Sequence, residues 1–454
     1  MFSNCNAIIL AAGEGKRMKS KTPKVLHSAA GKPLAAWVVD AAREATGQKP
    51  AVVIGNGAEQ VKEYFGDSVS YAVQPEQLGT GHAVMCAKEY LKGDGYALVV
   101  AGDMPLLRAE TLRKIIDAAQ SQDLGLCLLS AVVEDPAGYG RIVRGENTLR
   151  IVEHKDATEE ELKIKEVNPS VYCFKIPYLL EALSALKNDN SQNEYYITDC
   201  VKYISDKGYG AKAIVCADAE ECMGVNDRVQ LAKAAALLRK RINESLMLDG
   251  VTIIDPDSTY IEAGVKIGQD AVVYPGVTLE GNTVIAEDVI LYPGSRISNS
   301  TIGKGTKVQN SVILDSSVGE YSTIGPYAYL RPGSVIGNGC RVGDFVEVKN
   351  STIKDGAKVS HLSYIGDGEI GEKTNIGCGV VFVNYDGQKK SRTIVGRNAF
   401  IGCNVNLVAP VTVEDGAYVA AGSTVTKDVE KDALCIARCR QTVIEGWAKR
   451  RRGE

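Results

Sequence analysis

The sequence is poor in histidine and lacks closely paired cysteines. Four histidines occur in 454 residues, and the 12 cysteines are scattered from Cys5 to Cys439 without a Cys-X-X-Cys pair. Both the ligand spacing of a structural zinc site and the compact framework of a disulfide-rich domain are therefore missing. We expect most of the cysteines to be reduced, buried thiols.

An excess of one charge and long apolar runs are also lacking. Lys plus Arg is 52 and Asp plus Glu is 56, a net charge of -4, which gives no electrostatic drive toward nucleic acid or anionic membrane. No segment reaches the about 18 uninterrupted apolar residues of a membrane span, and residues 1–16 do not have the pattern of a secretory signal. We therefore expect a cytoplasmic protein without a nucleic-acid partner and without membrane insertion.

Glycine is what the sequence has in excess. It contributes 46 residues, about 10% against a usual value of about 7%, while aromatic residues are only 6%. With 45% hydrophobic and 24% charged residues, a chain of this length can bury a sizeable core, which excludes a disordered chain. Two or three domains are expected.

Residues 1–228 alternate short β-rich runs with longer amphipathic stretches. We predict buried strands at 6–12, 51–55, 69–73, 96–103 and 124–133, and helices at 35–45, 82–91 and 109–120. This alternation favours a mainly parallel, Rossmann-like α/β sheet covered on both faces, with ligands at the carboxyl ends of its strands. Residues 229–250 lack proline and internal glycine and follow Asn226 and Asp227 as caps, so they predict one long connecting helix.

From about residue 251 aliphatic residues recur with a period of six. The first series holds without a slip, and the register is then lost and resumed several times. The positions are Ile261, Ile267, Val273, Leu279, Ile285, Leu291 and Ile297; Val318, Ile324, Leu330, Ile336, Val342 and Val348; Ile353, Val359 and Ile365; Ile370, Ile376 and Phe382; and Val395, Ile401, Leu407, Val413, Val419 and Val425. A period of six fits neither a helix nor a hairpin and predicts a parallel β-helix, in which three units make one triangular coil.

The β-helix accounts for the excess glycine, because its corners need backbone angles that Gly, Asn and Asp accept. The longest interruption, residues 383–393, is expected to leave the coil as an exposed loop. The basic end of the chain, Lys449 to Arg452, is expected to be a solvated end. We therefore predict three parts: residues 1–228, a helical linker at 229–249, and residues 250–454.

A glycine turn follows the first predicted strand, in residues 10–26. It is neither GxGxxG nor a P-loop, since Met18 stands where the third glycine would be. A turn of this kind still lets backbone N–H groups approach phosphate, and Arg17 and Lys24 add positive charge. Combined with the spacing of Arg17 and Lys24, the segment resembles the signature of sugar-phosphate nucleotidyltransferases, in which the loop wraps the nucleoside triphosphate.

The resemblance implies a Mg²⁺ site and a nucleotide-sugar site. Asp103 ends the predicted strand at 96–103 and Asn226 lies in a Gly-Val-Asn motif, and in the resembled family these two positions bind magnesium. The remaining residues carried over for UTP and UDP-N-acetylglucosamine are Leu10, Ala11, Ala12, Gly13, Gln74, Gly79, Thr80, Ala101, Gly102, Gly140, Glu153 and Asn168. Gln74, Gly79 and Thr80 are assigned to the uracil side, and Gly140, Glu153 and Asn168 to the amino sugar. Ala101 replaces a bulkier residue of the family, which is expected to alter contacts near the nucleotide without removing the metal ligand.

Over essentially its whole length the chain resembles the bacterial bifunctional N-acetylglucosamine-1-phosphate uridyltransferase/glucosamine-1-phosphate acetyltransferases. The resemblance implies a left-handed β-helix that forms a homotrimer, with acyl-transfer sites between neighbouring coils. It also implies acetyl transfer from acetyl-CoA to glucosamine 1-phosphate, followed by uridylyl transfer from UTP with release of pyrophosphate. The product, UDP-N-acetylglucosamine, is a precursor of peptidoglycan and lipopolysaccharide.

Within the repeat region the resemblance assigns the acetyltransferase residues. His361, the only histidine there, is the expected general base, since an imidazole with a pKa of about 6.5 can accept the proton of an attacking amine. Glucosamine phosphate is expected at Arg331, Lys349, Tyr364 and Asn375, and acetyl-CoA at Cys378, Asn384, Tyr385, Lys390, Cys403, Ala421 and Arg438. The family usually has Ala at Cys378 and Ser at Cys403, so we expect thiol alkylation to inhibit acetyl transfer.

Two alternatives remain open on the sequence. The β-helix could serve only for oligomerisation or regulation of a single-activity nucleotidyltransferase, but the length of the repeat and residues such as His361 and Lys349 argue against this. A purely structural or ice-binding scaffold would require regular exposed threonine ladders, and none is apparent.

Overall fold

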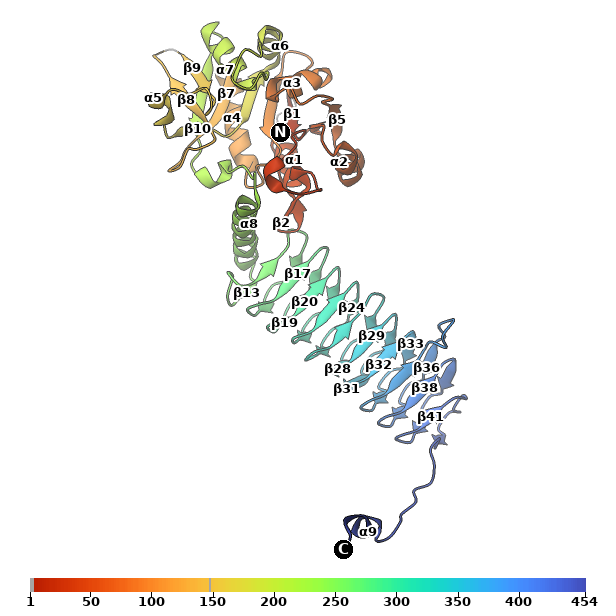
Figure 1. Ribbon diagram of the computed structural model, residues 1–454. Helices are drawn as coiled ribbons and strands as arrows, with labels where there is room; N and C mark the ends of the chain where they lie inside the picture. The colour runs from red at the N-terminus through yellow and green to blue at the C-terminus, as the bar shows by residue number, and fades with distance from the viewer. Residues whose placement is uncertain (1–3, 147) are drawn as a thin grey trace. The chain divides into compact units, whose positions relative to one another are not determined.

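The computed structural model describes residues 4–146 and 148–454 (Figure 1). The chain divides into two compact units, and the division falls inside helix α8 (Arg228–Leu248), between Leu238 and Arg239. The helix predicted at 229–250 is therefore present. In the described part of the chain, no helix combines the length and the apolar character needed to cross a membrane.

The first unit is built on a mixed ten-stranded sheet. Its order is β5 (Ser70–Val73), β4 (Ala51–Ile54), β1 (Cys5–Leu10), β6 (Tyr96–Ala101), β11 (Val171–Lys175), β7 (Leu126–Val132), β10 (Glu166–Asn168), β8 (Gly140–Arg144) and β9 (Leu149–Val152), with β12 (Ala211–Val215) beside β7. The strands β5, β4, β1 and β6 are parallel, as predicted, whereas β11 runs antiparallel between β6 and β7. A short hairpin, β2 (Ser28–Ala29) and β3 (Lys32–Pro33), lies outside the sheet.

Helices cover both faces of this sheet, as the sequence predicts. They are α1 (Leu34–Thr46), α2 (Ala58–Phe65), α3 (Thr80–Cys86), α4 (Ala109–Ser121), α6 (Ile176–Ala185) and α7 (Ile197–Asp206). The short helix α5 (Glu159–Leu162) buries no residue. Because side chains alternate along a strand, Ile9 of β1 packs in the cluster that contains α1 and α4, and Ile8 packs in the cluster that contains α3, α6 and α7. Helix α1 ends at Gly47, whose positive φ of 69° suits a residue without a side chain.

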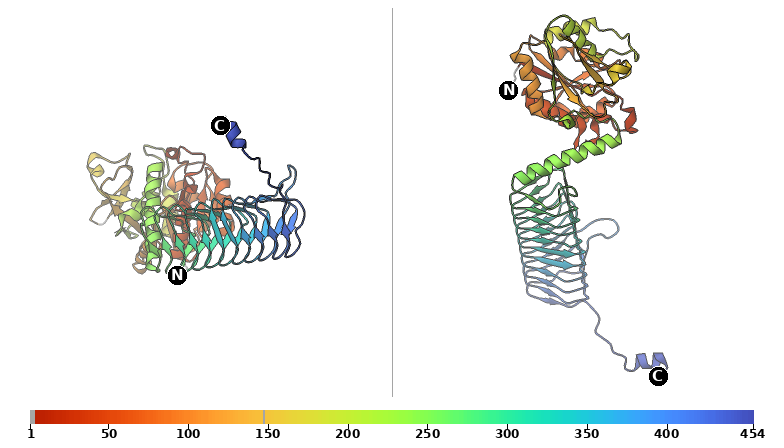
Figure 2. Two further views of the ribbon diagram at one scale, coloured as in Figure 1. Left: turned by 90° about the horizontal axis from the view of Figure 1, so that it is seen from below. Right: turned by 90° about the vertical axis from the view of Figure 1, so that its left-hand side faces the viewer.

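The second unit is a parallel β-helix of three stacked sheets (Figures 1 and 2). The first sheet holds β13 (Thr252–Ile253), β16 (Val272–Val273), β19 (Ile290–Leu291), β22 (Lys307–Val308), β25 (Thr323–Ile324), β28 (Arg341–Asp344), β31 (Lys358–His361), β34 (Asn375–Ile376), β37 (Phe400–Ile401), β40 (Tyr418–Val419) and β42 (Leu434–Cys435). The second holds β14 (Tyr260–Ile261), β17 (Thr278–Glu280), β20 (Arg296–Ser298), β23 (Val312–Leu314), β26 (Tyr329–Leu330), β29 (Glu347–Lys349), β32 (Tyr364–Gly366), β35 (Val381–Val383), β38 (Asn406–Val408) and β41 (Thr424–Val425). The third holds β15 (Lys266–Ile267), β18 (Val284–Ile285), β21 (Thr301–Ile302), β24 (Ser317–Val318), β27 (Val335–Ile336), β30 (Thr352–Ile353), β33 (Gly368–Ile370), β36 (Thr393–Val395) and β39 (Val411–Val413).

The aliphatic residues with the period of six form the core of this β-helix. All of the predicted positions are buried except Ile267, which is half-buried. Ile267 lies in the first coil, whose residues Ile253 and Ile261 are buried. The fold class expected from the periodicity is therefore confirmed, and the triangular coil explains why one residue in six points inward.

One corner of the coil departs from the expected residue types. This corner connects the first sheet to the second, and in three successive coils it carries Tyr327, Phe345 and Leu362 at positive φ. Each of these side chains is more than half exposed, and the rings of Tyr327 and Phe345 stack with their centroids 5.4 Å apart. Bulky residues in this conformation are strained, so their presence calls for a functional reason.

The interruption at 383–393 forms an arm between β35 and β36, which leaves the stack of coils (Figure 2). Tyr385 and Lys390 pair across its base, and the Asp386 carboxylate accepts hydrogen bonds of 2.8 Å from the amides of Gln388 and Lys389. The arm is thus an ordered turn. At the end of the chain, Lys449 to Arg452 lie exposed in α9 (Trp447–Arg452).

Candidate functional site

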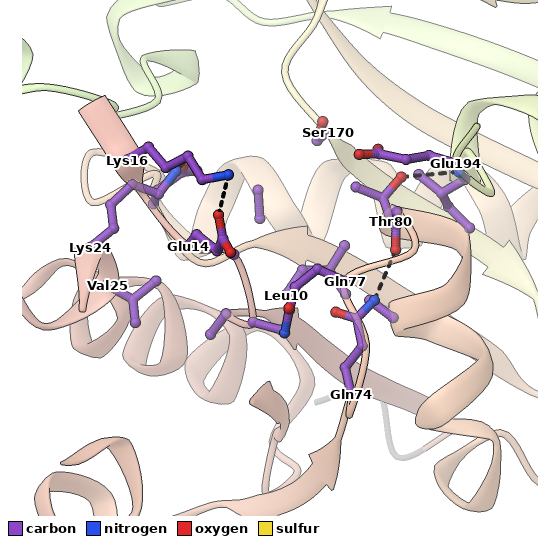
Figure 3. A pocket seen from close by; sticks show the side chains of 18 residues that line it. Leu10, Glu14, Lys16, Lys24, Val25, Gln74, Gln77, Thr80, Ser170 and Glu194 are labelled. Carbon is purple, nitrogen blue, oxygen red and sulfur yellow. Dashed lines mark hydrogen bonds and ion pairs between the residues drawn. The ribbon is translucent and has the colours of Figure 1, made fainter. Parts of the chain in front are cut away.

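A cavity of about 600 Å³ opens at the carboxyl ends of β1 and β6 in the first unit (Figure 3). It brings together many of the residues expected at the nucleotide: Leu10, Ala11, Ala12, Gly13, Lys24, Gln74, Gly79, Thr80, Ala101 and Asp103. Residues that the sequence did not single out also line it, among them Gln77, Ser170, Glu194 and Ile197. Gln77 belongs to the same loop as Gln74 and Gly79, whereas Ser170, Glu194 and Ile197 come from distant segments that only the fold brings to the cavity.

The turn before α3 is shaped for close approach of backbone. Gly79 has a φ of 104°, and a Cβ there would lie 2.6 Å from the carbonyl oxygen of Tyr195. The same carbonyl accepts from the Gly81 amide at 2.7 Å, and the Thr80 hydroxyl accepts from the Ile197 amide at 3.1 Å. The start of α3 is thereby held against the segment that leads into α7, and both border the cavity.

Two predicted nucleotide residues lie differently. The side chain of Arg17 is exposed and does not line the cavity, although it belongs to the glycine-rich loop. Gly102 follows β6 directly and is not among the residues that line the cavity, and its amide donates to the carbonyl oxygen of Leu10 at 2.9 Å. A Cβ on Gly102 would stand 2.9 Å from that oxygen, so glycine allows the close pairing of β1 and β6.

Asp103 and Asn226, the two predicted metal ligands, converge on one cation. The Lys24 ammonium donates to the Asp103 carboxylate and, over 3.2 Å, to Oδ1 of Asn226. The amide of Val225 donates to the carbonyl oxygen of Asp103 at 2.9 Å, which holds the two segments together. The oxygen atoms of Asp103 and Asn226 thus converge on one position, which the Lys24 ammonium contacts. Two hard oxygen ligands of this kind fit Mg²⁺, which takes its other ligands from substrate phosphates and water. No group of three or more His, Cys, Asp or Glu side chains in residues 4–146 and 148–454 could hold a metal by itself.

Gly140, Glu153 and Asn168 form a second cluster. Gly140 and Asn168 are directly opposite each other in β8 and β10, and a Cβ on Gly140 would lie 3.5 Å from Oε2 of Glu153. Burial raises the pKa of Glu153, although the Thr198 hydroxyl donates to it at 3.1 Å. Oδ1 of Asn168 accepts from the amide of Ser170, which lines the nucleotide cavity. The cluster therefore adjoins that cavity through Ser170.

In the second unit, His361 belongs to a column of equivalent positions in successive coils. Cys378, Cys403 and Ala421 follow it in the next coils, each two residues after an inward-pointing aliphatic residue of the first sheet. The amide of Asn404 donates to the carbonyl oxygen of Cys378, and that of Gly422 to Cys403, both at 2.8 Å, which confirms the register. We call His361, Cys378, Cys403 and Ala421 the corner column. Cys378 is half-buried and Cys403 is exposed.

His361 also has a partner that the sequence did not identify. Its Nδ1 lies 3.0 Å from Oδ1 of Asp344, which occupies the equivalent position one coil earlier. The hydrogen bond with His361 holds the pKa of Asp344 below its ordinary value. The signal was present as a spacing of 17 residues, the length of one coil, but this spacing is meaningful only when the register is known.

Arg331, Lys349 and Tyr364 belong to three successive coils on the second sheet. Nη1 of Arg331 donates to Oε1 of Glu347 at 2.8 Å, and this hydrogen bond raises the pKa of Arg331. Glu347 pairs in register with Tyr364 of the next coil. Asn375 lies on the first sheet, between Lys358 and Phe400 of the neighbouring coils, and so belongs to the sheet of His361.

The arm places a second cation beside Lys349. Contact with the Lys349 ammonium holds the pKa of Lys390 below its ordinary value. Asp367 lies nearby: burial opposes its ionisation, but hydrogen bonds from Asn350 and Asn384 keep its pKa below the ordinary value. Two ammonium groups in contact form a site that an anion would stabilise.

The remaining residues expected at acetyl-CoA lie around the arm and the last coils. The Tyr385 hydroxyl donates to the carbonyl oxygen of Gly387 at 2.7 Å, and its ring is exposed. Cδ of Arg438 would lie 3.8 Å from a Cβ on Gly422, which places Arg438 beside the last member of the corner column. The structure thus distributes the predicted acetyltransferase residues over different corners of the β-helix. The corner column lies between the first and second sheets, whereas Asn384, Tyr385 and Lys390 belong to the arm between the second and third sheets.

Comparison with known proteins gives matches in both units. The family described as MobA-like NTP transferase domain matches residues 7–192, and the bacterial transferase hexapeptide family matches residues 315–350 and 392–427, which identifies the β-helix as the left-handed hexapeptide type. The chain is 54% identical over 448 residues to the bifunctional protein GlmU of Clostridium botulinum, with 98% of each chain covered. It is 54% identical over 449 residues to that of Clostridium perfringens (98% and 99% covered) and 52% identical over 450 residues to that of Clostridioides difficile (99% and 98%).

Proposed function

Because the chain belongs to the bifunctional GlmU family, we propose that it makes UDP-N-acetylglucosamine in two steps, one in each unit. Glucosamine 1-phosphate is acetylated by acetyl-CoA, and UTP then activates the product with release of pyrophosphate. The observation that carries the proposal is the presence of two separate clusters of chemically suited residues. One surrounds Asp103 in the first unit, and the other surrounds His361 in the second.

The uridylyl step is assigned to residues 1–228. A phosphate oxygen of N-acetylglucosamine 1-phosphate attacks the α-phosphorus of UTP, the bond to the bridging oxygen breaks, and pyrophosphate leaves. Lys24 can bind phosphate oxygens from the cavity wall, and Gly140, Glu153 and Asn168 supply directional hydrogen bonds for the amino sugar. Asp103 and Asn226 would hold Mg²⁺, which when bound neutralises charge on the α-phosphate and on pyrophosphate.

The acetyl step is assigned to residues 250–454, with residues 229–249 as the linker. The amine nitrogen attacks the thioester carbon, the carbon–sulfur bond breaks, and the amine proton passes to Nε2 of His361 and then to the CoA sulfur. Arg331, Lys349 and Lys390 supply positive charge for the sugar phosphate. Acetyl-CoA would extend along the corner column, from Cys378 past Cys403 and Ala421 toward Arg438. Asn384 and Tyr385 would contact it from the arm, which leaves the coil at the corner between the second and third sheets.

A homotrimer in the cytoplasm completes the proposal. Tyr327, Phe345 and Leu362 form an exposed apolar row at the corner next to His361, and such a row is suited to burial against another copy of the chain. Replacing Leu362 by Asp should shift the protein from trimer to monomer in light scattering after gel filtration. Replacing Ile394, which is 40% exposed on the third sheet, by Asp is the control and should leave the trimer intact.

Two substitutions test the two activities together. His361→Ala should abolish CoA release with glucosamine 1-phosphate and spare pyrophosphate release from UTP, and Asp103→Ala should do the reverse. Each variant is thus the folding control of the other. Full acetyl transfer by His361→Ala would show that the base is assigned wrongly. A protein that never acetylates but forms UDP-N-acetylglucosamine would be the single-activity nucleotidyltransferase.

A further inference from the structure

Asp344 and His361 face each other across one step of the β-helix. They pair in register in β28 and β31, and the amide of Leu362 donates to the carbonyl oxygen of Asp344 at 2.9 Å. The parallel pairing fixes both backbones, and the side chains then meet with Oδ1 and Nδ1 3.0 Å apart. This pairing is a property of the rigid coil, so it exists before any substrate binds.

The side chain of His361 has little else to fix it. The described hydrogen bonds of His361 other than that to Asp344 are made by its carbonyl oxygen, which accepts from the Ser363 hydroxyl at 2.8 Å and from the Gly379 amide at 3.4 Å. The imidazole side chain is 51% exposed, so solvent alone would leave it free to turn about its χ angles. The contact with Asp344 is what selects one orientation.

The same contact selects one tautomer. An ionised carboxylate has acceptors and no donor, so the imidazole nitrogen that faces it must carry the proton. Asp344 remains ionised at neutral pH, because the hydrogen bond from His361 and the nearby Arg341 both hold its pKa below the ordinary value. Nε2, on the other side of the ring, then has the free lone pair that a general base needs.

We propose that Asp344 is a positioning residue for acetyl transfer, which holds the His361 imidazole in the Nδ1–H tautomer with Nε2 directed to the substrate amine. The inference rests on the proposed function, because it assigns no role to Asp344 without a base at His361. Asp344 touches neither substrate nor cofactor in this role. It acts by keeping His361 in one ring orientation and one tautomer, where the free imidazole would adopt several.

Steady-state kinetics separate positioning from binding. Asp344→Ala should lower kcat for CoA release about 10- to 100-fold, as the loss of a group that orients a metal-bound histidine does, with unchanged KM for both substrates. Asp344→Asn should lose less, since its Oδ1 can still accept from Nδ1. Glu372→Ala, which removes an exposed acid from a different corner of the next coil, is the matched control and should behave as wild type. Pyrophosphate release from UTP should be unchanged in all three.

The tautomer can be read directly. The chain has four histidines, so ¹⁵N-histidine labelling and solid-state NMR of the sedimented protein give few signals, and His361→Ala assigns the one of interest. In wild type that signal should show a protonated Nδ1 and a bare Nε2, and in Asp344→Ala a mixture of tautomers. Wild-type kcat and an unchanged His361 signal in Asp344→Ala would overturn the inference. A fully active His361→Ala would instead overturn the proposed base, whatever the NMR of Asp344→Ala shows.

Discussion

The side-chain amide nitrogen of Gln74 lies 3.2 Å from Nδ1 of His82 and donates to the carbonyl oxygen of Gly79 over 3.1 Å. In the His82 tautomer that carries its proton on Nε2, Nδ1 accepts from Gln74, and both protons of the Gln74 amide are used within the protein. Figure 3 shows the bond toward the turn before α3. Oε1 remains as an acceptor at the cavity wall. Uracil presents a donor at N3 and cytosine an acceptor, so this arrangement favours UTP.

We therefore expect His82→Ala to lower the preference for UTP over CTP by about one order of magnitude, because the Gln74 amide is no longer held in one orientation. The measurement is kcat/KM for pyrophosphate release with each nucleotide. Cys86, whose sulfur lies 3.8 Å from Nε2 of His82, provides the control, since Cys86→Ala leaves the contact between Gln74 and His82 in place. Equal preference in His82→Ala and wild type would contradict the role given to this contact.

Glu153→Gln should stabilise the protein while weakening the uridylyl step. Burial raises the pKa of Glu153 above 4.5, so the folded state holds this proton more tightly than the unfolded chain does. The group therefore favours folding fully only below about pH 4.5, and this contribution is lost as the pH rises through the elevated pKa. At pH 7 the neutral glutamine avoids the cost of a buried charge.

The expected result is a higher Tm for Glu153→Gln at pH 7 and no gain at pH 4, measured by calorimetry. The kcat/KM for N-acetylglucosamine 1-phosphate should fall about tenfold, because a neutral amide is a weaker acceptor for sugar hydroxyls than a carboxylate. Glu161→Gln should have the opposite effect on stability. Hydrogen bonds from Thr158 and Arg150 lower the pKa of Glu161 to about 2, so its loss should lower the Tm at pH 7.

Lys390→Met should impair recognition of the sugar phosphate. Lys349 and Lys390 repel each other until an anion binds. Removal of one of the two cations should therefore weaken phosphate binding more than it lowers the stability of the protein without ligand. The KM for glucosamine 1-phosphate should rise on the order of tenfold with little change in kcat. Lys389→Met, in the same arm, is the control. A rise in KM for acetyl-CoA alone would show that Lys390 serves the other substrate.

Gly368→Ala should destabilise the β-helix through a clash with Phe382. An added Cβ would lie 2.6 Å from two ring carbons of Phe382, whose side chain is fully buried. We expect a loss of about 1–3 kcal/mol, the usual cost of overpacking, seen as a lower Tm of this unit in calorimetry. The double variant Gly368→Ala/Phe382→Leu should recover part of the loss. An equal loss in both would place the cause in the backbone rather than in the ring.

Alkylation of Cys378 and Cys403 should inhibit acetyl transfer. Both belong to the corner column, where an attached maleimide would obstruct the path proposed for acetyl-CoA. The variant Cys378→Ala/Cys403→Ser should keep acetyl transfer and resist maleimide, while pyrophosphate release is unaffected in either protein. Mass spectrometry that finds both cysteines modified with acetyl transfer intact would contradict this prediction.

The repeating part of the fold was the more predictable from sequence. A period of six identifies inward positions directly, because each coil repeats one simple environment, and among the predicted positions only Ile267 is not fully buried. In the first unit the hydrophobic pattern predicted β1, β4, β5, β6 and β7, but not the antiparallel insertion of β11 between β6 and β7. The alternation of strands and helices predicts parallel neighbours. It does not show that a strand from later in the chain, such as β11, inserts in the antiparallel direction.

The site was predictable in its residues more than in its contacts. Asp103 and Asn226 were expected to act together, yet the bridging role of Lys24 depends on segments 79 and 202 residues away. Asp344 was missed for a related reason, because an aspartate on a β-helix surface is ordinary until its coil is known to precede that of His361. Single-residue chemistry can be read from a sequence, whereas pairing across coils requires the register.

The corner column also acts as a ruler. Its members are separated by the spacing of adjacent strands, about 4.8 Å, whatever their side chains are. A long, flexible molecule that lies along the column therefore meets contacts at fixed intervals between the base at His361 and Ala421. Deleting one whole coil between them would keep the fold and every corner, yet would bring the far contacts one step closer. The β-helix thereby separates two properties that usually change together, the stability of a scaffold and the length of substrate that it accepts.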